Sequence, residues 1–188
     1  IRSQSQVHVV VCKLRCVLTC AGDRTAKIWD SEAGSCLTTL LGHSDRIFSA
    51  SFSADGKLAV TSSQDSTAKI WDTDTGGCLT LEEHGRGVTS ASFSSDGRLV
   101  VTSSRDRTAK TWDVESADCL QTLRGHRDQV IAASFSSDDK AVVTASGDHT
   151  AKLWSTKGGF LLRTLEGHVY GLSGASFSPD GRLVLTSS

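Results

Sequence analysis

TAKIWD occurs at residues 25–30 and again at 67–72, and two near copies follow, TAKTWD at 108–113 and TAKLWS at 150–155. The tryptophans in these stretches, Trp29, Trp71, Trp112 and Trp154, are 42, 41 and 42 residues apart. A fixed period of this length is typical of a chain built from several copies of one supersecondary unit. Each unit buries its apolar face against its neighbours, so the repeat decides the fold.

Each copy carries the signals of four short strands. Within residues 43–83 these are IFSASFS (47–53), LAVTSS (58–63), TAKIWD (67–72) and CLTLEE (78–83). The sequences between them, Asp55-Gly56 and Gln64-Asp65-Ser66, favour tight turns. Four short strands separated by frequent turns predict an antiparallel sheet, called a blade below. Small residues at 49–51 indicate that the first strand faces a crowded central axis.

We therefore expect an all-β fold of four four-stranded antiparallel blades and one half blade. A degenerate first blade covers residues 1–41, blades 2 to 4 cover 42–82, 83–124 and 125–166, and the first half of blade 5 covers 167–188. Blade 2 is one residue short between Cys78 and His84. A slip of one residue reverses the faces of a strand, so we expect a bulge or a shortened turn there.

Two further motifs recur in phase with the tryptophans. Gly-His pairs precede the first strand (Gly42-His43, Gly125-His126, Gly167-His168, with Glu83-His84 as a variant), and an aspartate fills the second turn (Asp23, Asp65, Asp106, Asp148). With the Trp-Asp pairs, these motifs make residues 5–188 resemble the WD-repeat β-propeller family. The similarity is closest to the long arrays of near-identical copies in HET-E-like and Notchless-like proteins.

The resemblance implies a β-propeller, and most members of the family close a ring of seven or sometimes eight blades. Four and a half blades would leave an open arc with exposed strand edges. The chain contains no methionine and begins with isoleucine, so we expect a partial propeller that is an internal piece of a longer polypeptide or a processed product. The missing blades would lie in that parent chain, or a partner would cover the open edge.

The resemblance also implies a buried hydrogen-bond chain in each blade, from the tryptophan indole through a Ser or Thr hydroxyl and a histidine to the turn aspartate. The expected sets are His43, Ser63 (or Thr61), Asp65 and Trp71; His84, Ser104, Asp106 and Trp112; and His126, Ser146, Asp148 and Trp154. Blade 1 has Ile1 and Ala21 in place of the histidine and the serine. Similar residue types form hydrolase triads, but an active site is normally single, and this set occurs three times. We expect structural sets, with no catalytic, cofactor-binding or metal-binding residues.

Composition restricts the class further. The net charge of −1 gives no overall attraction to nucleic acid or anionic membranes, and no apolar run approaches the roughly 20 residues that span a bilayer. Cys36, Cys78 and Cys119 share a repeat position with Leu161, which indicates apolar packing rather than disulfides or metal ligands. We interpret Cys12, Cys16 and Cys20 in the same way. A cytoplasmic or nuclear location fits these thiols, and secretion does not.

Residues that differ between the copies are the candidates for partner binding. One face of the propeller carries the loops before the first strands and the second turns, where the sequence places Arg24, Arg46, Arg86, Arg105, Arg107 and Arg127. The free acids expected on that face are Asp45 and Asp128. By analogy with the family, ligands contact side chains at the channel mouth. The candidate partner-binding residues are Arg46, Phe48, Gln64, Arg105, Arg107, Gln129 and Ile131.

We therefore expect an interaction scaffold without catalytic activity, a domain or subunit of a larger assembly. Its expected partners are proteins with acidic or phosphorylated segments, because arginines beside apolar Phe48 and Ile131 resemble a peptide hot spot. The alternative is a propeller that binds RNA through the arginine-rich face, although lysines and stacking aromatic residues do not cluster there. An enzyme is disfavoured, since the sequence offers no non-repeating nucleophile–base pair, phosphate-binding loop or metal set.

Overall fold

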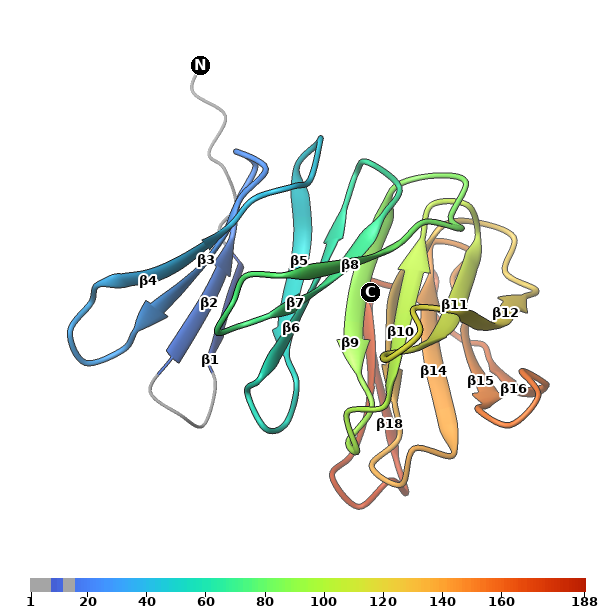
Figure 1. Cartoon of the computed structure of the whole chain (residues 1–188). Coiled ribbons are helices and arrows are strands. Elements are labelled where there is room, and N and C mark those ends of the chain that lie inside the picture. The colour runs from blue at the N-terminus through green and yellow to red at the C-terminus, as the bar shows by residue number, and fades with distance from the viewer. Residues whose placement is uncertain (1–7, 12–15) are drawn as a thin grey trace.

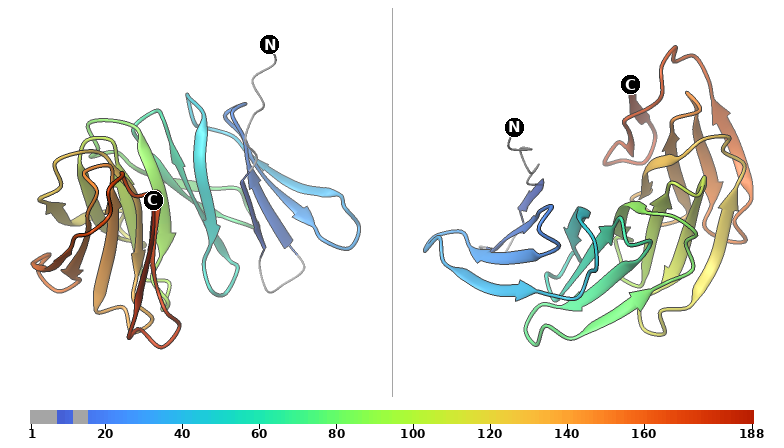
Figure 2. Two further views of the ribbon diagram at one scale, coloured as in Figure 1. Left: turned by 180° about the vertical axis from the view of Figure 1, so that it is seen from behind. Right: turned by 90° about the horizontal axis from the view of Figure 1, so that it is seen from above.

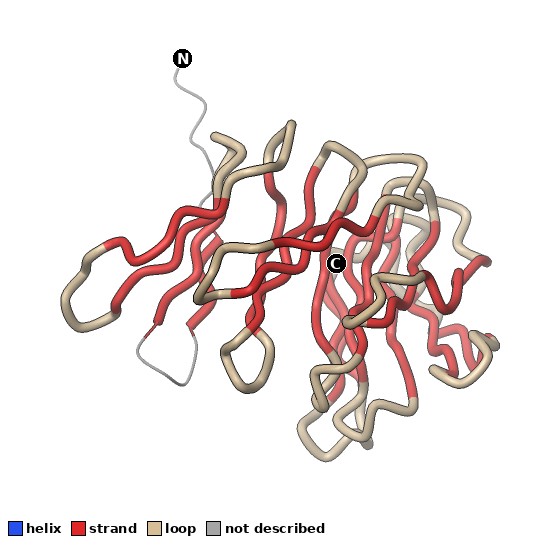
Figure 3. The backbone as a smooth tube through the Cα atoms, viewed as in Figure 1, coloured by secondary structure: helices blue, strands red, loops and turns tan. Residues whose placement is uncertain are grey.

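The computed structural model describes residues 8–11 and 16–188, and every helix or strand element in this part of the chain is a β-strand (Figure 3). No helix that could cross a membrane occurs there. The predictions for Ile1 and Cys12 lie outside the described residues.

The strands form four four-stranded sheets and one two-stranded sheet, with consecutive strands paired antiparallel (Figure 1). Blade 1 contains β1 (His8–Val11), β2 (Cys16–Cys20), β3 (Ala26–Asp30) and β4 (Cys36–Leu40). Blade 2 contains β5 (Ile47–Phe52), β6 (Leu58–Ser63), β7 (Ala68–Asp72) and β8 (Cys78–Leu81). Blade 3 contains β9 (Val88–Phe93), β10 (Leu99–Ser104), β11 (Thr108–Asp113) and β12 (Cys119–Arg124). Blade 4 contains β13 (Val130–Phe135), β14 (Ala141–Ser146), β15 (Ala151–Ser155) and β16 (Leu161–Leu165), and the last sheet contains β17 (Gly174–Phe177) and β18 (Val184–Ser187).

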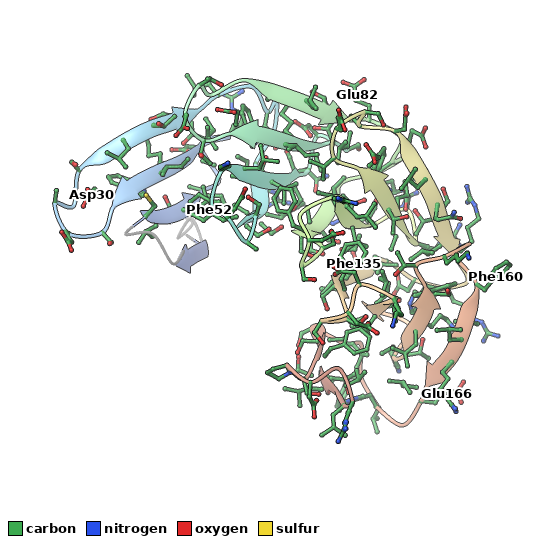
Figure 4. The ribbon with its side chains drawn as sticks, turned by 60° about the horizontal axis from the view of Figure 1, so that its bottom comes forward. Asp30, Phe52, Glu82, Phe135, Phe160 and Glu166 are labelled. Atoms are coloured by element: carbon green, nitrogen blue, oxygen red, sulfur yellow. The ribbon has the colours of Figure 1, made fainter. Side chains whose placement is uncertain are left out.

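The sheets follow one another around an open arc, which the view from above shows directly (Figure 2, right). Phe52 of β5 and Phe135 of β13 lie on the inner side of this arc, and Phe160 lies on its outer side (Figure 4). The expected all-β fold, a partial propeller with four four-stranded blades and a smaller fifth sheet, is confirmed.

Serine hydroxyls join the first strands of neighbouring blades. Ser49 Oγ accepts the Ala91 N–H at 3.1 Å, and Ser90 Oγ accepts the Ala133 N–H at 3.2 Å. Ser51 Oγ donates back to the Ala91 carbonyl at 3.3 Å. The small polar residues of these strands therefore leave room near the axis and also satisfy main-chain groups of the next blade, which belongs to a different sheet.

The tryptophans of blades 2, 3 and 4 each pack against the preceding blade. Trp71 shares a core with Leu18 and Ile28 of blade 1, and Trp112 and Trp154 lie in the two cores that follow. These three side chains are 1–2% exposed. Trp29 carries the same motif but is only half-buried, because the described residues include no blade before it.

The missing residue of blade 2 removes a bulge instead of creating one. Where the third and fourth strands pair, the register shifts between Ile28 and Trp29, between Thr111 and Trp112, and between Leu153 and Trp154. In blade 2 the pairing of β7 with β8 is continuous, with Trp71 opposite Cys78. The extra residue that forms a bulge in the other fourth strands is the one that β8 lacks.

Cysteines in the fourth strands are not core residues. Cys36 and Cys78 are exposed, so the expectation of apolar packing is wrong at these two positions. Cys119 is half-buried and packs against the core between blades 2 and 3, as expected. The fourth strand is the outer edge of each blade, with no neighbouring strand beyond it in its sheet. Cys20, by contrast, is buried in the core between blades 1 and 2, where packing was expected.

Thr111 is a polar residue in an apolar position. Ile28, Ile70 and Leu153 stand at the equivalent sites, and Thr111 is 1% exposed with no hydrogen-bond partner for its hydroxyl. Because a buried unpaired hydroxyl is unfavourable, we expect Thr111→Val to raise the free energy of unfolding by about 1 kcal/mol. Chemical denaturation at constant pH measures the change. A lower stability would contradict the assignment of Thr111 as unpaired.

Candidate functional site

A chain of hydrogen bonds links four side chains of blade 2. Trp71 Nε1 donates to Thr61 Oγ1 at 2.8 Å, and Thr61 Oγ1 lies 2.8 Å from His43 Nε2. His43 Nδ1 lies 2.8 Å from Asp65 Oδ2. With an ionised aspartate as the acceptor, the neutral imidazole carries its proton on Nδ1, and the Thr61 hydroxyl donates to Nε2.

Blades 3 and 4 repeat this geometry closely. In blade 3, Thr102 Oγ1 lies 2.8 Å from Trp112 Nε1 and 2.7 Å from His84 Nε2, and His84 Nδ1 lies 2.8 Å from Asp106. The distances among Trp154, Thr144, His126 and Asp148 in blade 4 are 2.9, 2.8 and 2.9 Å. Three of the four residue types in each expected set are therefore brought together.

The serine of each expected set, Ser63, Ser104 or Ser146, is not part of the hydrogen-bond chain, so these three assignments are wrong. In blade 2 the alternative residue, Thr61, is confirmed. Trp71 is paired with Ala59, so Ser63 lies four residues farther along the strand, about 13 Å away and out of reach of the indole. Thr61 is two residues from Ala59 and on the same face of the strand.

Each of these serines instead holds a turn. Ser63 Oγ donates to the carbonyls of Asp45 and Arg46 at 3.0 Å and accepts the Asp65 N–H at 3.1 Å. Ser104 makes the equivalent contacts in blade 3. In blade 4, Ser146 donates to the Asp128 carbonyl and accepts the Asp148 N–H. The serine therefore positions the aspartate, while the threonine carries the chain.

The turn aspartates are held as carboxylates. Burial raises the pKa of Asp65, but hydrogen bonds from Thr67, His43 and the Ser44 amide outweigh this effect and lower the pKa to about 2. The same opposing causes keep the pKa values of Asp106 and Asp148 below the ordinary range.

The glycine before the histidine leaves space for the tryptophan indole. A Cβ on Gly125 would lie 3.3 Å from the Trp154 side chain, and the φ of Gly125 is +151°.

Ionisation of His43 and His126 is disfavoured. Burial lowers the pKa of His43 and of His126, although their aspartate partners act in the opposite direction. The three chain histidines have side chains that are only 0–1% exposed. A substrate therefore has no access to these imidazoles, which supports a structural role for the repeated set.

Stability should fall in two stages on acidification. The pKa values of His43 and His126 are lower in the folded state than in the unfolded state. Their contribution to the free energy of unfolding is therefore complete above about pH 6.5 and declines as the pH falls below that value. Asp65 contributes above its ordinary pKa of 3.8 and loses this contribution between about pH 4 and 2, on the order of 1 kcal/mol after screening by water. Thermal melts across this range measure both stages. A melting temperature that rises from pH 7 to 5 would contradict the histidine assignment.

The incomplete networks at the two ends of the arc retain single links. Trp29 Nε1 donates to Thr19 Oγ1 at 2.8 Å, whereas Asp23 is bonded to Thr25. In the last sheet, His168 Nε2 lies 2.8 Å from Thr186 Oγ1. The threonine hydroxyl therefore bonds to the tryptophan or to the histidine even where the other residues of the hydrogen-bond chain are missing.

The arginine-rich face contains one compact cluster of candidate residues. The guanidinium carbons of Arg46 and Arg105 lie 5.1 and 4.9 Å from the centroid of the Phe48 ring. Arg105 Nη1 donates to Gln64 Oε1 at 2.8 Å, so the second turn of blade 2 also fixes this arginine. Phe48, a candidate apolar contact for a ligand, supports both guanidinium groups.

This cluster borders a cavity of about 470 Å³ that extends over blades 2, 3 and 4. It is lined by Gln64, Ser66, Gly85, Arg86, Gly87, Arg105, Asp128 and Gln129. Arg107 and Ile131 are absent from its lining and from the contacts around Phe48. Arg86 and Asp128 were not among the candidates, although the sequence carries a signal: position 86 is an arginine where the neighbouring copies have aspartates.

Metal-binding geometry is absent from the described residues, where no three His, Cys, Asp or Glu side chains gather as they would around an ion. The unpaired thiols Cys36 and Cys78 lie on separate fourth strands.

Comparison with protein families gives one match, repeated along the chain. The family described as WD domain, G-beta repeat matches residues 4–30, 34–72, 78–113, 117–155 and 159–188. Each internal match begins at or just before the fourth strand of one blade and ends with the third strand of the next. No curated protein matches the chain.

Proposed function

The chain belongs to the WD-repeat family, whose repeats form protein-interaction domains, and we propose that it is a non-catalytic scaffold within a larger assembly. Its partners are proteins that present acidic or phosphorylated segments to the arginine-rich face. The observation that carries this proposal is the contact of Arg46 and Arg105 with the Phe48 ring.

These guanidinium groups are held in place but lack anionic partners. Neither Arg46 nor Arg105 forms an ion pair with a described acid, and Arg105 Nε is buried without a hydrogen-bond partner. Both guanidinium carbons lie about 5 Å from one ring centroid, so two positive charges share one small region of this face. An anion bound beside them would offset this charge and use donors that are already ordered.

Acids on the same face are engaged locally. Asp45 Oδ1 accepts the Arg46 N–H and Asp128 Oδ1 accepts the Gln129 N–H, each at 2.7 Å. Arginine binds carboxylate and phosphate through two parallel hydrogen bonds, which favours a peptide side chain with such a group over a neutral one.

The test is a binding comparison between two charge-reversal variants. Arg46→Glu/Arg105→Glu is expected to lose binding to acidic and phosphorylated peptides, whereas Asp74→Lys/Glu115→Lys, which changes exposed acids of the third-to-fourth-strand turns, is expected to retain it. Loss in the second variant with retention in the first would place the binding face elsewhere. Peptide arrays probed with both variants and the unmodified protein give the comparison.

RNA binding is the competing outcome of the same experiment. It would appear as an affinity for single-stranded RNA that falls steeply with salt and exceeds the affinity for every peptide. That result would replace the peptide proposal.

The exposed apolar end of the arc indicates a further contact. Leu183, directly before β18, and Leu185, within β18, are 70% and 72% exposed. We propose that further blades or a partner chain cover this end of the arc.

Exposed thiols at Cys36 and Cys78 suit a reducing compartment, so we propose a cytoplasmic or nuclear location.

A further inference from the structure

One position in the loop before the first strand reverses its charge in blade 3. The second residue after the histidine is Asp45 in blade 2, Arg86 in blade 3 and Asp128 in blade 4. In blades 2 and 4 the carboxylate accepts the main-chain N–H of the next residue at 2.7 Å. The fold thus contains two copies of an amide capped by a carboxylate.

Blade 3 keeps the amide but has lost the cap. Gly87 follows Arg86, and no described residue accepts the Gly87 N–H. The loop is otherwise held as in the other blades, because the Gly87 carbonyl accepts the Arg105 N–H at 3.0 Å and the Ser104 hydroxyl at 3.1 Å. An amide donor is therefore presented in a fixed loop with its usual anionic partner absent.

Two arginines line the same cavity as this donor. Gly87, Arg86, Arg105 and Gln64 line the same cavity, and Arg105 Nε has no partner. Gln64 accepts from Arg105 through Oε1, which leaves its amide nitrogen as a further donor. A Cβ on residue 87 would lie 3.0 Å from Gln64 Oε1, so the glycine allows Gln64 to pack beside the loop. Asp128 also lines the cavity, but its carboxylate accepts the Gln129 amide.

We propose that a carboxylate or phosphate group of a partner peptide occupies, in blade 3, the place that the Asp45 and Asp128 side chains fill in blades 2 and 4. The group accepts the Gly87 N–H and is neutralised by Arg86 and Arg105. This inference rests on the proposed function, because it gives the arginine-rich face one defined anion site. The internal repeat supplies the expected geometry, an anionic oxygen close to the amide nitrogen.

Arg86→Asp is the decisive variant, because it restores the residue that the neighbouring copies carry and is therefore compatible with the fold. Its carboxylate is expected to cap the Gly87 amide and exclude the ligand. Arg98→Asp makes the same charge change at an exposed residue in the turn between β9 and β10 and serves as the matched control. Fluorescence anisotropy measures binding of labelled Gly-Ser peptides that contain one glutamate, one phosphoserine or one alanine.

The glutamate and phosphoserine peptides are expected to bind the unmodified protein and the Arg98→Asp variant, and the alanine peptide is not. In Arg86→Asp the affinity for both anionic peptides is expected to fall about tenfold to a hundredfold, as for a lost charge-assisted hydrogen bond. Binding to only one of the two anionic peptides would identify which group the site accepts. Unchanged affinity in Arg86→Asp would overturn the proposed site.

Amide NMR spectra of the unmodified protein locate the anion independently of any peptide. Titration with inorganic phosphate and with acetate is expected to shift the Gly87 resonance. If the Gly87 resonance stays fixed while Arg46→Glu/Arg105→Glu still abolishes peptide binding, the site is wrong and the proposed function stands. If the Gly87 resonance shifts while that double variant binds peptides normally, an anion binds near Gly87 without Arg105, and both the peptide site and the proposed function are wrong.

Discussion

Thr102→Val is expected to lower the free energy of unfolding by about 2–6 kcal/mol, although it changes the shape of the side chain very little. The Thr102 hydroxyl accepts from Trp112 Nε1 and lies 2.7 Å from His84 Nε2, and it is completely buried. Valine would leave both nitrogens without a partner in the core, and each unpaired group costs about 1–3 kcal/mol. Urea denaturation of the two proteins measures the difference.

Thr111→Val is the matched control for this experiment. The substitution is chemically identical and lies in the same blade, but Thr111 has no hydrogen-bond partner, so the expected change has the opposite sign. If both variants lose stability equally, the cost arises from the valine itself and the hydrogen-bond chain has no special role.

Trp112→Ala is expected to cost about 3–5 kcal/mol, the usual range for a large buried aromatic side chain. Trp112 is 1% exposed and packs against blade 2 in one of the central cores. The equivalent change at the half-buried Trp29 should cost considerably less, because less of its surface is removed from water and no histidine joins its network.

Thermal and chemical denaturation of the two tryptophan variants provide the measurement. An equal loss of stability would contradict the described packing, since it would require Trp29 to be buried as deeply as Trp112.

Much of the fold could be predicted because each copy repeats the same local signals. Asp-Gly turns and alternating strands recur in phase, so errors in one copy are corrected by the others. The position of Thr61 was less accessible: Thr61 and Ser63 share one strand face, and only the register that pairs Trp71 with Ala59 decides between them.

Features that depend on neighbouring blades could not be predicted from a single copy. Trp29 carries the same motif as Trp71 but has no described blade to pack against, and Cys36 lies on an outer edge that a Cys-or-Leu pattern does not reveal. The contact of Arg105 with Phe48 joins blades 2 and 3. No spacing within one repeat indicates it, although the candidate positions at the channel mouth include both residues.

The central claim is that the repeated His–Thr–Asp–Trp chain stabilises the fold while residues that vary between copies bind the partner. The most direct test is the dissociation constant of the phosphoserine peptide for Thr102→Val and for Arg46→Glu/Arg105→Glu, measured where both variants remain folded. We predict that Thr102→Val binds as the unmodified protein does despite its lower melting temperature, and that the arginine variant loses binding with little change in melting temperature. The account would be contradicted if a folded Thr102→Val protein no longer bound the peptide while the arginine variant still bound it.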